Sequence, residues 1–181
     1  FTPISNYQWS DSSVTARSVE WQIQRASITT TPVQSGSLTY SGLAQSPSWS
    51  NYDSAQLTIG GTTSGTNAGN YNATFTPTSN YQWSDGGTGA KTVAWKIGKA
   101  AGSLSLNKTS ITLNKSTSAT TITVTRAGDG AITATSSSTS VATVSVSGNT
   151  VTVTGKAYGS ATITVKVAEG TNHTAPANKT C

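Results

Sequence analysis

The sequence predicts an all-β chain of tandem β-sandwich modules with no substantial helix. Short segments alternate β-branched apolar residues with threonine, as in 121–125, 150–154 and 161–167. This alternation is typical of a strand with one buried face and one wet face. Turn residues separate the segments, at 128–130, 147–149 and Gly159. No window of the sequence carries a convincing helical stripe of apolar residues.

The composition excludes several classes of protein. Charged residues make up 9% of the 181 residues, and serine and threonine together number 62. One Cys and one His are too few for a zinc site or an internal disulfide, and a hydrolytic triad would depend on His173 alone. Five Trp and six Tyr within a patterned, 34% apolar sequence argue against disorder. We therefore expect a protein that is not an enzyme, with no catalytic residues, no metal site and no cofactor.

The net charge of +5 is spread thinly along the chain. Residues 1–100 hold five basic and four acidic side chains, and residues 101–181 hold six and two. A nucleic-acid surface would need a basic stripe, so we expect no nucleic-acid partner. No apolar run approaches the ~20 residues of a membrane span, so we expect no membrane insertion.

An internal repeat sets the organisation of the chain. Residues 1–26 recur as residues 75–100 without a gap, with 15 identical positions. The repeat predicts that 1–26 is the C-terminal part of a truncated β module and that 27–100 is a complete one. Residues 101–181 resemble neither and form a third unit. We expect the chain to be a piece of a longer array, with short and stiff connections such as 97–101.

The complete module has two recognisable strand faces. Tyr71, Ala73 and Phe75 share one face of a strand, and a long hairpin at 77–90 follows it. Val93, Trp95 and Ile97 share one face of the last strand. The same pattern at Val19, Trp21 and Ile23 predicts that these three side chains are also buried.

The stretch 67–73 resembles the tyrosine corner of immunoglobulin-type sandwiches, in which a Tyr hydroxyl bonds to the backbone a few residues upstream. The Cys that usually follows two residues after this Tyr is replaced by Ala73. The fold would therefore rely on apolar burial instead of an inter-sheet disulfide.

Residues 102–181 resemble the bacterial immunoglobulin-like domain of group 2. The matching runs are 132–144, 148–153 and 155–165, with Ser-Val-Ala-Thr-Val followed by Ala-Thr-Ile-Thr-Val. The family often has Trp where this chain has Ala134. The resemblance implies an immunoglobulin-like sandwich whose last strand is incomplete near Cys181. We interpret that Cys as a small buried hydrophobic residue and not as a nucleophile.

Residues 27–100 resemble the short all-β repeats found beside such domains in large surface proteins of Gram-positive bacteria and their phages. The likeness lies in 38–42, 51–53 and 68–71. Both resemblances imply an extracellular location, at the cell surface or on a virion, and a non-enzymatic role.

The hairpin aromatics are the candidate binding residues. Tyr7, Trp9, Tyr81 and Trp83 could stack on sugar rings, or they could fold over the end of the module as a small core. Asp11, Asp85 and Asp129 lie in turns, where a carboxylate accepts bonds from nearby amides. These aspartates are too scattered to predict a calcium site.

These observations predict a structural and adhesive repeat region of a bacterial surface protein or phage tail fibre, acting as a spacer and display scaffold. Its main partners would be neighbouring repeats of the same chain. One alternative is a carbohydrate-binding module that uses the hairpin aromatics on surface polysaccharide. Another is a filament subunit that self-associates, with strands from neighbouring chains completing each sandwich.

Overall fold

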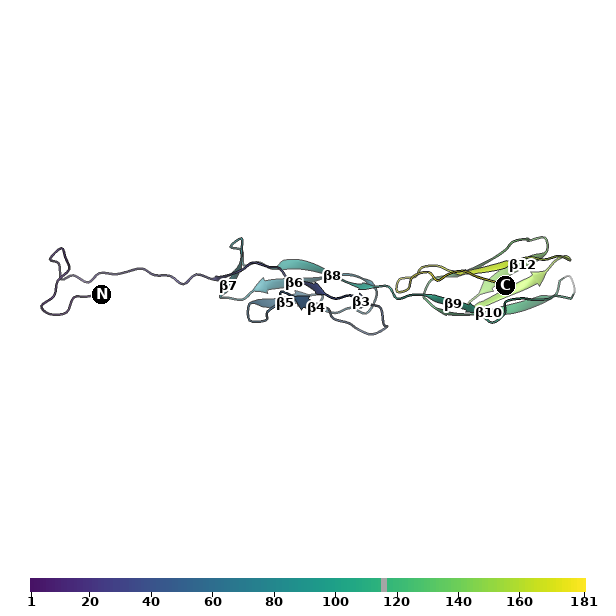
Figure 1. Cartoon of the computed structure of the whole chain (residues 1–181), viewed down its shortest axis with the longest axis horizontal. Helices are drawn as coiled ribbons and strands as arrows, with labels where there is room; N and C mark the ends of the chain where they lie inside the picture. Colours follow the sequence, from purple (N-terminus) through teal and green to yellow (C-terminus); the bar gives the residue numbers. More distant parts are fainter. Residues whose placement is uncertain (115–116) are drawn as a thin grey trace.

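The computed structural model describes residues 1–114 and 117–181, and in these ranges it contains strands and loops but no helix. Figure 1 shows three parts in series along the long axis. They are an extended N-terminal segment (residues 1–25), a middle unit (residues 26–98) and a C-terminal unit (residues 100–181). The predicted all-β fold class is confirmed.

The middle unit holds the first eight strands. They are β1 (Ala26–Ile28), β2 (Val33–Ser35), β3 (Leu38–Thr39), β4 (Ser48–Ser50), β5 (Leu57–Gly61), β6 (Gly69–Pro77), β7 (Tyr81–Trp83) and β8 (Lys91–Gly98). Its main sheet has the order β3-β8-β6-β5, and the pairs β2-β4 and β1-β7 form two smaller sheets. Most neighbours are antiparallel, but β3 on β8 and β1 on β7 are parallel.

Alternation along β6 and β8 builds the core of the middle unit. The two strands pair with Tyr71 opposite Trp95, which brings their apolar residues to the same face of the sheet. Phe75, Trp95 and Ile97 are buried on that face, and Val93 is partly buried. Trp49 from β4 meets Phe75 edge to face, with ring centroids 4.9 Å apart, and so joins the second sheet to the first. The predicted faces of both strands are confirmed.

The tyrosine corner is also present. The Tyr71 hydroxyl donates a 2.7 Å hydrogen bond to the carbonyl of Asn67, four residues upstream. Its ring stacks on Trp95 with centroids 4.5 Å apart. The Trp95 indole N–H in turn donates to the Thr62 carbonyl at 2.7 Å. These contacts fix the two rings at the end of the unit where β6 begins.

The C-terminal unit holds the remaining strands. They are β9 (Ser103–Leu106), β10 (Ala119–Ala127), β11 (Ile132–Ser136), β12 (Ala142–Ser147), β13 (Thr150–Gly155), β14 (Ile163–Val167) and β15 (Lys179–Thr180). They form two sheets, β12-β13-β10-β9 and β11-β14-β15. The core between them is aliphatic, with Ile122, Val151 and Val165 fully buried. Ala134, on β11, is partly buried against this aliphatic core.

The chain reaches Cys181 immediately after the short strand β15. Cys181 donates a backbone hydrogen bond to Ile163 and accepts one from it, at 2.9 and 2.8 Å. Its side chain is partly buried against the core, and this burial raises the pKa of the thiol. A thiol held in its neutral form is a poor nucleophile, which agrees with its interpretation as a small packed residue.

The N-terminal segment departs from the prediction. Val19, Trp21 and Ile23 are 65%, 81% and 85% exposed, so the expectation that they are buried is wrong. The matching residues of β8 are covered because they pack in a core with residues of other elements, such as Ile28 and Leu57. Residues 1–25 form no strand, and no sheet packs against these side chains. Alternation is therefore present at 19–23, but neither a strand nor a covering sheet accompanies it.

Candidate functional site: the junctions between units

Two hairpins related by the sequence repeat have the same internal bonding. We call residues 1–17 the N-terminal hairpin and residues 75–91 the module hairpin. The backbone N–H of Trp9 donates to Ser13 at 2.9 Å, and that of Trp83 donates to Gly87 at 2.8 Å. The two indole N–H groups donate to the carbonyls of residues 15 and 89, at 2.9 and 2.7 Å.

An aspartate and a cation close each hairpin in the same way. Asp85 accepts the amide of Gly87 at 2.8 Å and pairs with Lys91 at 3.1 Å, and Lys91 lies 4.7 Å from the Trp83 ring centre. Asp11 accepts the amide of Ser13 and pairs with Arg17. The amide hydrogen bond from Gly87 lowers the pKa of Asp85 most, and a hydrogen bond from the Ser13 hydroxyl lowers that of Asp11 most. The turn role predicted for both aspartates is confirmed.

The candidate sugar-stacking residues lie in unlike surroundings. Trp83 is 2% exposed and packs in the core, so neither face of its ring is open to a sugar. Tyr81 is partly buried against the same core. Tyr7 is 68% exposed, and Trp9 is partly exposed. Sugar stacking therefore stays a prediction for Tyr7, Trp9 and Tyr81. Trp83 is buried, as expected from the alternative in which the hairpin aromatics form a small core at the end of the module.

One difference between Trp9 and Trp83 is a docked strand, whose Ile28 shares the core with Trp83. Strand β1 pairs in parallel with β7 of the module hairpin, with Ala26 opposite Tyr81 and Ile28 opposite Trp83. Ala26 donates its N–H to the Asn80 carbonyl at 2.9 Å, and Ile28 accepts the N–H of Ser84 at 3.0 Å. We call this contact the first junction, because it holds the strand by which the chain passes from residues 1–25 into the middle unit.

The second junction repeats this geometry one module later. Ala100, the repeat equivalent of Ala26, forms a parallel bridge with His173. Its N–H donates to the Asn172 carbonyl at 2.9 Å, and its carbonyl accepts the N–H of Thr174 at 2.9 Å. The connection between the two units is therefore a hydrogen-bonded strand and not a free linker.

The residue before each alanine is a cation that bonds to the same receiving loop. Arg25 donates from Nε to the Ser79 carbonyl at 2.9 Å. Lys99 donates to the Gly170 carbonyl at 2.8 Å and forms an ion pair with Glu169. Both junctions thus consist of a basic residue and an alanine laid against a Ser/Thr-Asn-Tyr/His turn.

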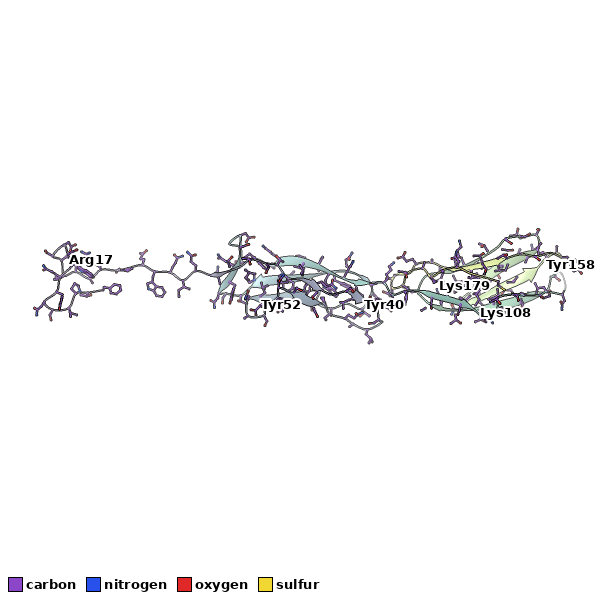
Figure 2. All side chains as sticks on the ribbon, viewed as in Figure 1. Arg17, Tyr40, Tyr52, Lys108, Tyr158 and Lys179 are labelled. Carbon is purple, nitrogen blue, oxygen red and sulfur yellow. The ribbon has the colours of Figure 1, made fainter. Side chains whose placement is uncertain are left out.

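Side chains of the middle unit add to the second junction. The Tyr40 ring meets the His173 ring edge to face, with centroids 5.2 Å apart. The amide of Ala68 donates to the Asn172 side-chain oxygen at 2.8 Å, and the Asn172 side-chain amide donates to the Asn67 side chain at 3.3 Å. Figure 2 shows Tyr40 at the end of the middle unit that faces the C-terminal unit. At the second junction, side chains and backbone of the middle unit therefore contact the C-terminal unit at several points besides the Ala100 bridge.

A carboxylate holds the receiving loop in shape. Asp129 accepts the Asn172 backbone N–H at 2.9 Å and contacts the His173 Nδ1 at 3.2 Å. The hydrogen bond from Asn172, more than the contact with His173, lowers the pKa of this carboxyl group. Gly170 lets the loop pass close to Asp129, since a Cβ there would lie 2.1 Å from the carboxylate oxygen. His173, the single His of the chain, is thus a junction residue.

Sequence reasoning predicted short, stiff connections but not their docking on the next unit. A signal was present in the repeat, where Arg25-Ala26 matches Lys99-Ala100. A second signal was the recurrence of Ser/Thr-Asn-Tyr/His at 5–7, 79–81 and 171–173. Neither signal is a periodic pattern of apolar side chains. Strand periodicity in the sequence therefore does not reveal either of them.

The far end of the C-terminal unit has an open cavity of about 320 Å³. Ile111, Leu113, Val153 and Cys181 are among its lining residues, and no charged side chain of the described ranges lines it. Within residues 1–114 and 117–181, no three His, Cys, Asp or Glu side chains gather as a metal site would require. The same ranges contain no helix with the length and hydropathy needed to cross a membrane.

Comparison with known proteins bears on the C-terminal unit. Residues 100–177 match the family model of the bacterial Ig-like domain (group 2). No curated protein matches the chain. The match begins at Ala100, the residue whose backbone forms the second junction. The sequence motifs, the two-sheet fold and the family model therefore agree in matching residues 100–177 to the bacterial Ig-like domain of group 2.

Proposed function

We propose that this chain is a non-enzymatic spacer and display region of an extracellular bacterial protein, carried at the cell surface or in a phage tail fibre. Its units would be held in line by docked junctions, so that the array keeps its length under load. The observation that carries this proposal is the repetition of one junction geometry at Ala26 and Ala100. A recurring entry strand of this kind suits a linear array, because it holds the incoming chain on each unit. At the second junction, Tyr40 and Ala68 of the preceding unit add contacts to the loop that receives this strand.

The chemistry of the surface supports the same role. The two junctions rest on neutral backbone hydrogen bonds, which salt screens little, and the ion pairs beside them are exposed and weak. The low charge and the threonine-rich outer faces keep the surface hydrated without strong electrostatic fields. The match to an Ig-like domain of bacteria is in keeping with an extracellular location.

Spin-label distance measurements across the second junction test the proposal. One label is placed at Ser64 and one at Ser147, both exposed, in a Cys181→Ser background. We expect a narrow distance distribution that does not change between low and high salt. Ala100→Pro removes the N–H that bonds to Asn172 and should broaden the distribution, while Ala101→Pro, whose N–H is outside the junction bonds, should leave it narrow. A broad distribution in the unaltered junction would contradict a stiff spacer.

A carbohydrate-binding role is the second candidate, because Tyr7 and Trp21 are exposed aromatics on the N-terminal segment. Stacking of a sugar ring on either side chain would add adhesion to the spacer role. A glycan array probed with the full chain and with a Tyr7→Ala, Trp21→Ala double variant separates the two. Glycans bound only by the unaltered chain would support adhesion, and equal binding by both proteins would contradict it.

A further inference from the structure

Two neighbouring strands of the middle unit receive the tension when the chain is stretched. The chain enters the unit at Ala26, passes through β1 and β2 to β3, and leaves it at Gly98, the end of β8. Strand β3 runs parallel to β8, with Leu38 opposite Ile97. Tension therefore pulls the entering segment and β8 in opposite directions along a common axis. The two must slide past each other, so all the bonds between them resist at once, whereas strands opened from one end lose their bonds one at a time.

The backbone ladder between the entering segment and β8 is short. It consists of the pairing of 38–39 with 97–98, and the amide of Tyr40 adds a 2.9 Å bond to the Gly98 carbonyl. Earlier along the entering segment, β2 pairs with β4 and so belongs to the other sheet. Among the described residues, no strand pairs with this edge of β8 at Lys96.

The side chain of Gln34, on β2, occupies this gap in the ladder. Its Nε2 donates to the Lys96 carbonyl at 3.1 Å, and its Oε1 accepts the Lys96 N–H at 2.9 Å. A side-chain amide carries a donor and an acceptor, as a backbone residue does, so it replaces the strand residue that the ladder lacks at this point. The two bonds therefore join the entering segment directly to the strand by which the chain leaves the unit.

We propose that Gln34 is a force-bearing residue, which lengthens the contact between the entering segment and β8 by one rung. We call the bonds of residues 34–40 to residues 96–98 the strand clamp. The proposal rests on the proposed spacer function and assigns its resistance to load to named groups. The alternative is that Gln34 only satisfies the backbone of Lys96 at a sheet edge. Such a bond would matter equally for every pulling direction, whereas a clamp acts only when the load passes through the entering segment.

Gln45 provides a chemically matched control. Its Nε2 donates to the Thr39 carbonyl at 2.9 Å, and its backbone forms a bridge with Gly65. The side-chain bond joins β3 to the loop that follows it and does not reach β8. Substitution of either glutamine by methionine keeps the length of the side chain and removes its hydrogen bonds. The two variants therefore differ in whether the lost bonds belong to the strand clamp.

The test is single-molecule force spectroscopy of the full chain, held by handles at its two ends, in which each unit gives its own unfolding event. At one constant force, Gln34→Met should raise the unfolding rate of the middle unit about tenfold, because two hydrogen bonds that oppose sliding are lost. Gln45→Met should leave that rate close to the value of the unaltered chain. The event of the C-terminal unit should not change in either variant. An unchanged gain in length on unfolding shows that the middle unit of each variant is folded.

A second pulling direction separates the strand clamp from a bond that is only structural. One handle is moved to Ser54→Cys, an exposed position in the turn after β4, in a Cys181→Ser background. The other handle stays at the C-terminal end. The load then bypasses the entering segment, so Gln34→Met should no longer change the unfolding rate.

Three results would each overturn the proposal. They are an unchanged rate for Gln34→Met with handles at the two chain ends, equal effects of Gln34→Met and Gln45→Met, and an equal effect of Gln34→Met in both pulling directions. The spin-label distances across the second junction do not depend on Gln34, so the spacer function and the strand clamp can fail separately.

Discussion

The backbone N–H of Ala100 donates a 2.9 Å hydrogen bond to the carbonyl of Asn172, which makes the connection between the two units part of a β-bridge. Ala26 makes the same bond to Asn80 one module earlier. Because the two alanines are equivalent in the repeat, the bond belongs to the repeat and not to one pair of units. This relationship is the basis of the proposed spacer function.

The repeat offers a matched pair of tryptophans, one in the core of the middle unit and one in the N-terminal segment. Trp95→Ala should lower the free energy of unfolding by about 3–5 kcal/mol, because Trp95 is 2% exposed and its removal leaves a cavity. Trp21 is its repeat equivalent and is exposed, so Trp21→Ala should change stability by less than about 0.5 kcal/mol. Urea unfolding followed by circular dichroism measures both values. Equal costs for the two variants would contradict the structure of the N-terminal segment.

The tyrosine corner should tolerate no side chain at Gly65. A Cβ there would lie 2.5 Å from the Tyr71 ring, which is held by Asn67 and by stacking on Trp95. Gly65→Ala should therefore cost about 1–3 kcal/mol of stability through overpacking. At Gly69 a Cβ would meet nothing within 4 Å, so Gly69→Ala is the control and should be close to neutral. Thermal unfolding of the two variants provides the comparison, and a neutral Gly65→Ala would show that the ring is free to move.

Acid should loosen the second junction. The pKa of Asp129 is lowered from its ordinary value of 3.8, chiefly by the Asn172 N–H, so the folded state favours the charged carboxylate. The resulting stability is fully present above that ordinary value and is lost as the pH falls through the lower, folded-state pKa. The protection factor of the Asn172 amide, which is its exchange rate corrected for the intrinsic pH dependence of exchange, should therefore fall at low pH more than the protection factors of amides in the buried strands. Asp129→Asn should remove this extra pH dependence. If the dependence is unchanged in that variant, it comes from another titrating group.

Local patterns in the sequence predicted much of the fold. Alternation placed Phe75 and Trp95 on buried faces, and the spacing around Tyr71 identified its corner, because each depends on residues close together in one strand or turn. The same alternation failed at Trp21. A period of two marks a strand face but does not tell whether a second sheet exists to cover it.

The junctions could not be predicted in the same way. The parallel pairing of Ala26 with Tyr81 joins distant residues through backbone atoms, and backbone atoms leave no pattern in the side chains. His173 illustrates the point, since its sequence neighbourhood is a polar tail while its ring contacts Tyr40 of another unit. The recurrence of Arg/Lys-Ala was visible, but the turn that receives it became evident only in three dimensions.

Residual dipolar couplings of the full chain test the central claim most directly, because they report how the two units are oriented to each other in solution. If the second junction is docked, the amides of the middle unit and of the C-terminal unit fit one alignment tensor of the same magnitude and direction. Ala100→Pro should then split this into two tensors of unequal magnitude, while Ala101→Pro should retain one. Two different tensors in the unaltered chain would mean that the units move independently, and would contradict the account of a stiff, junction-docked spacer.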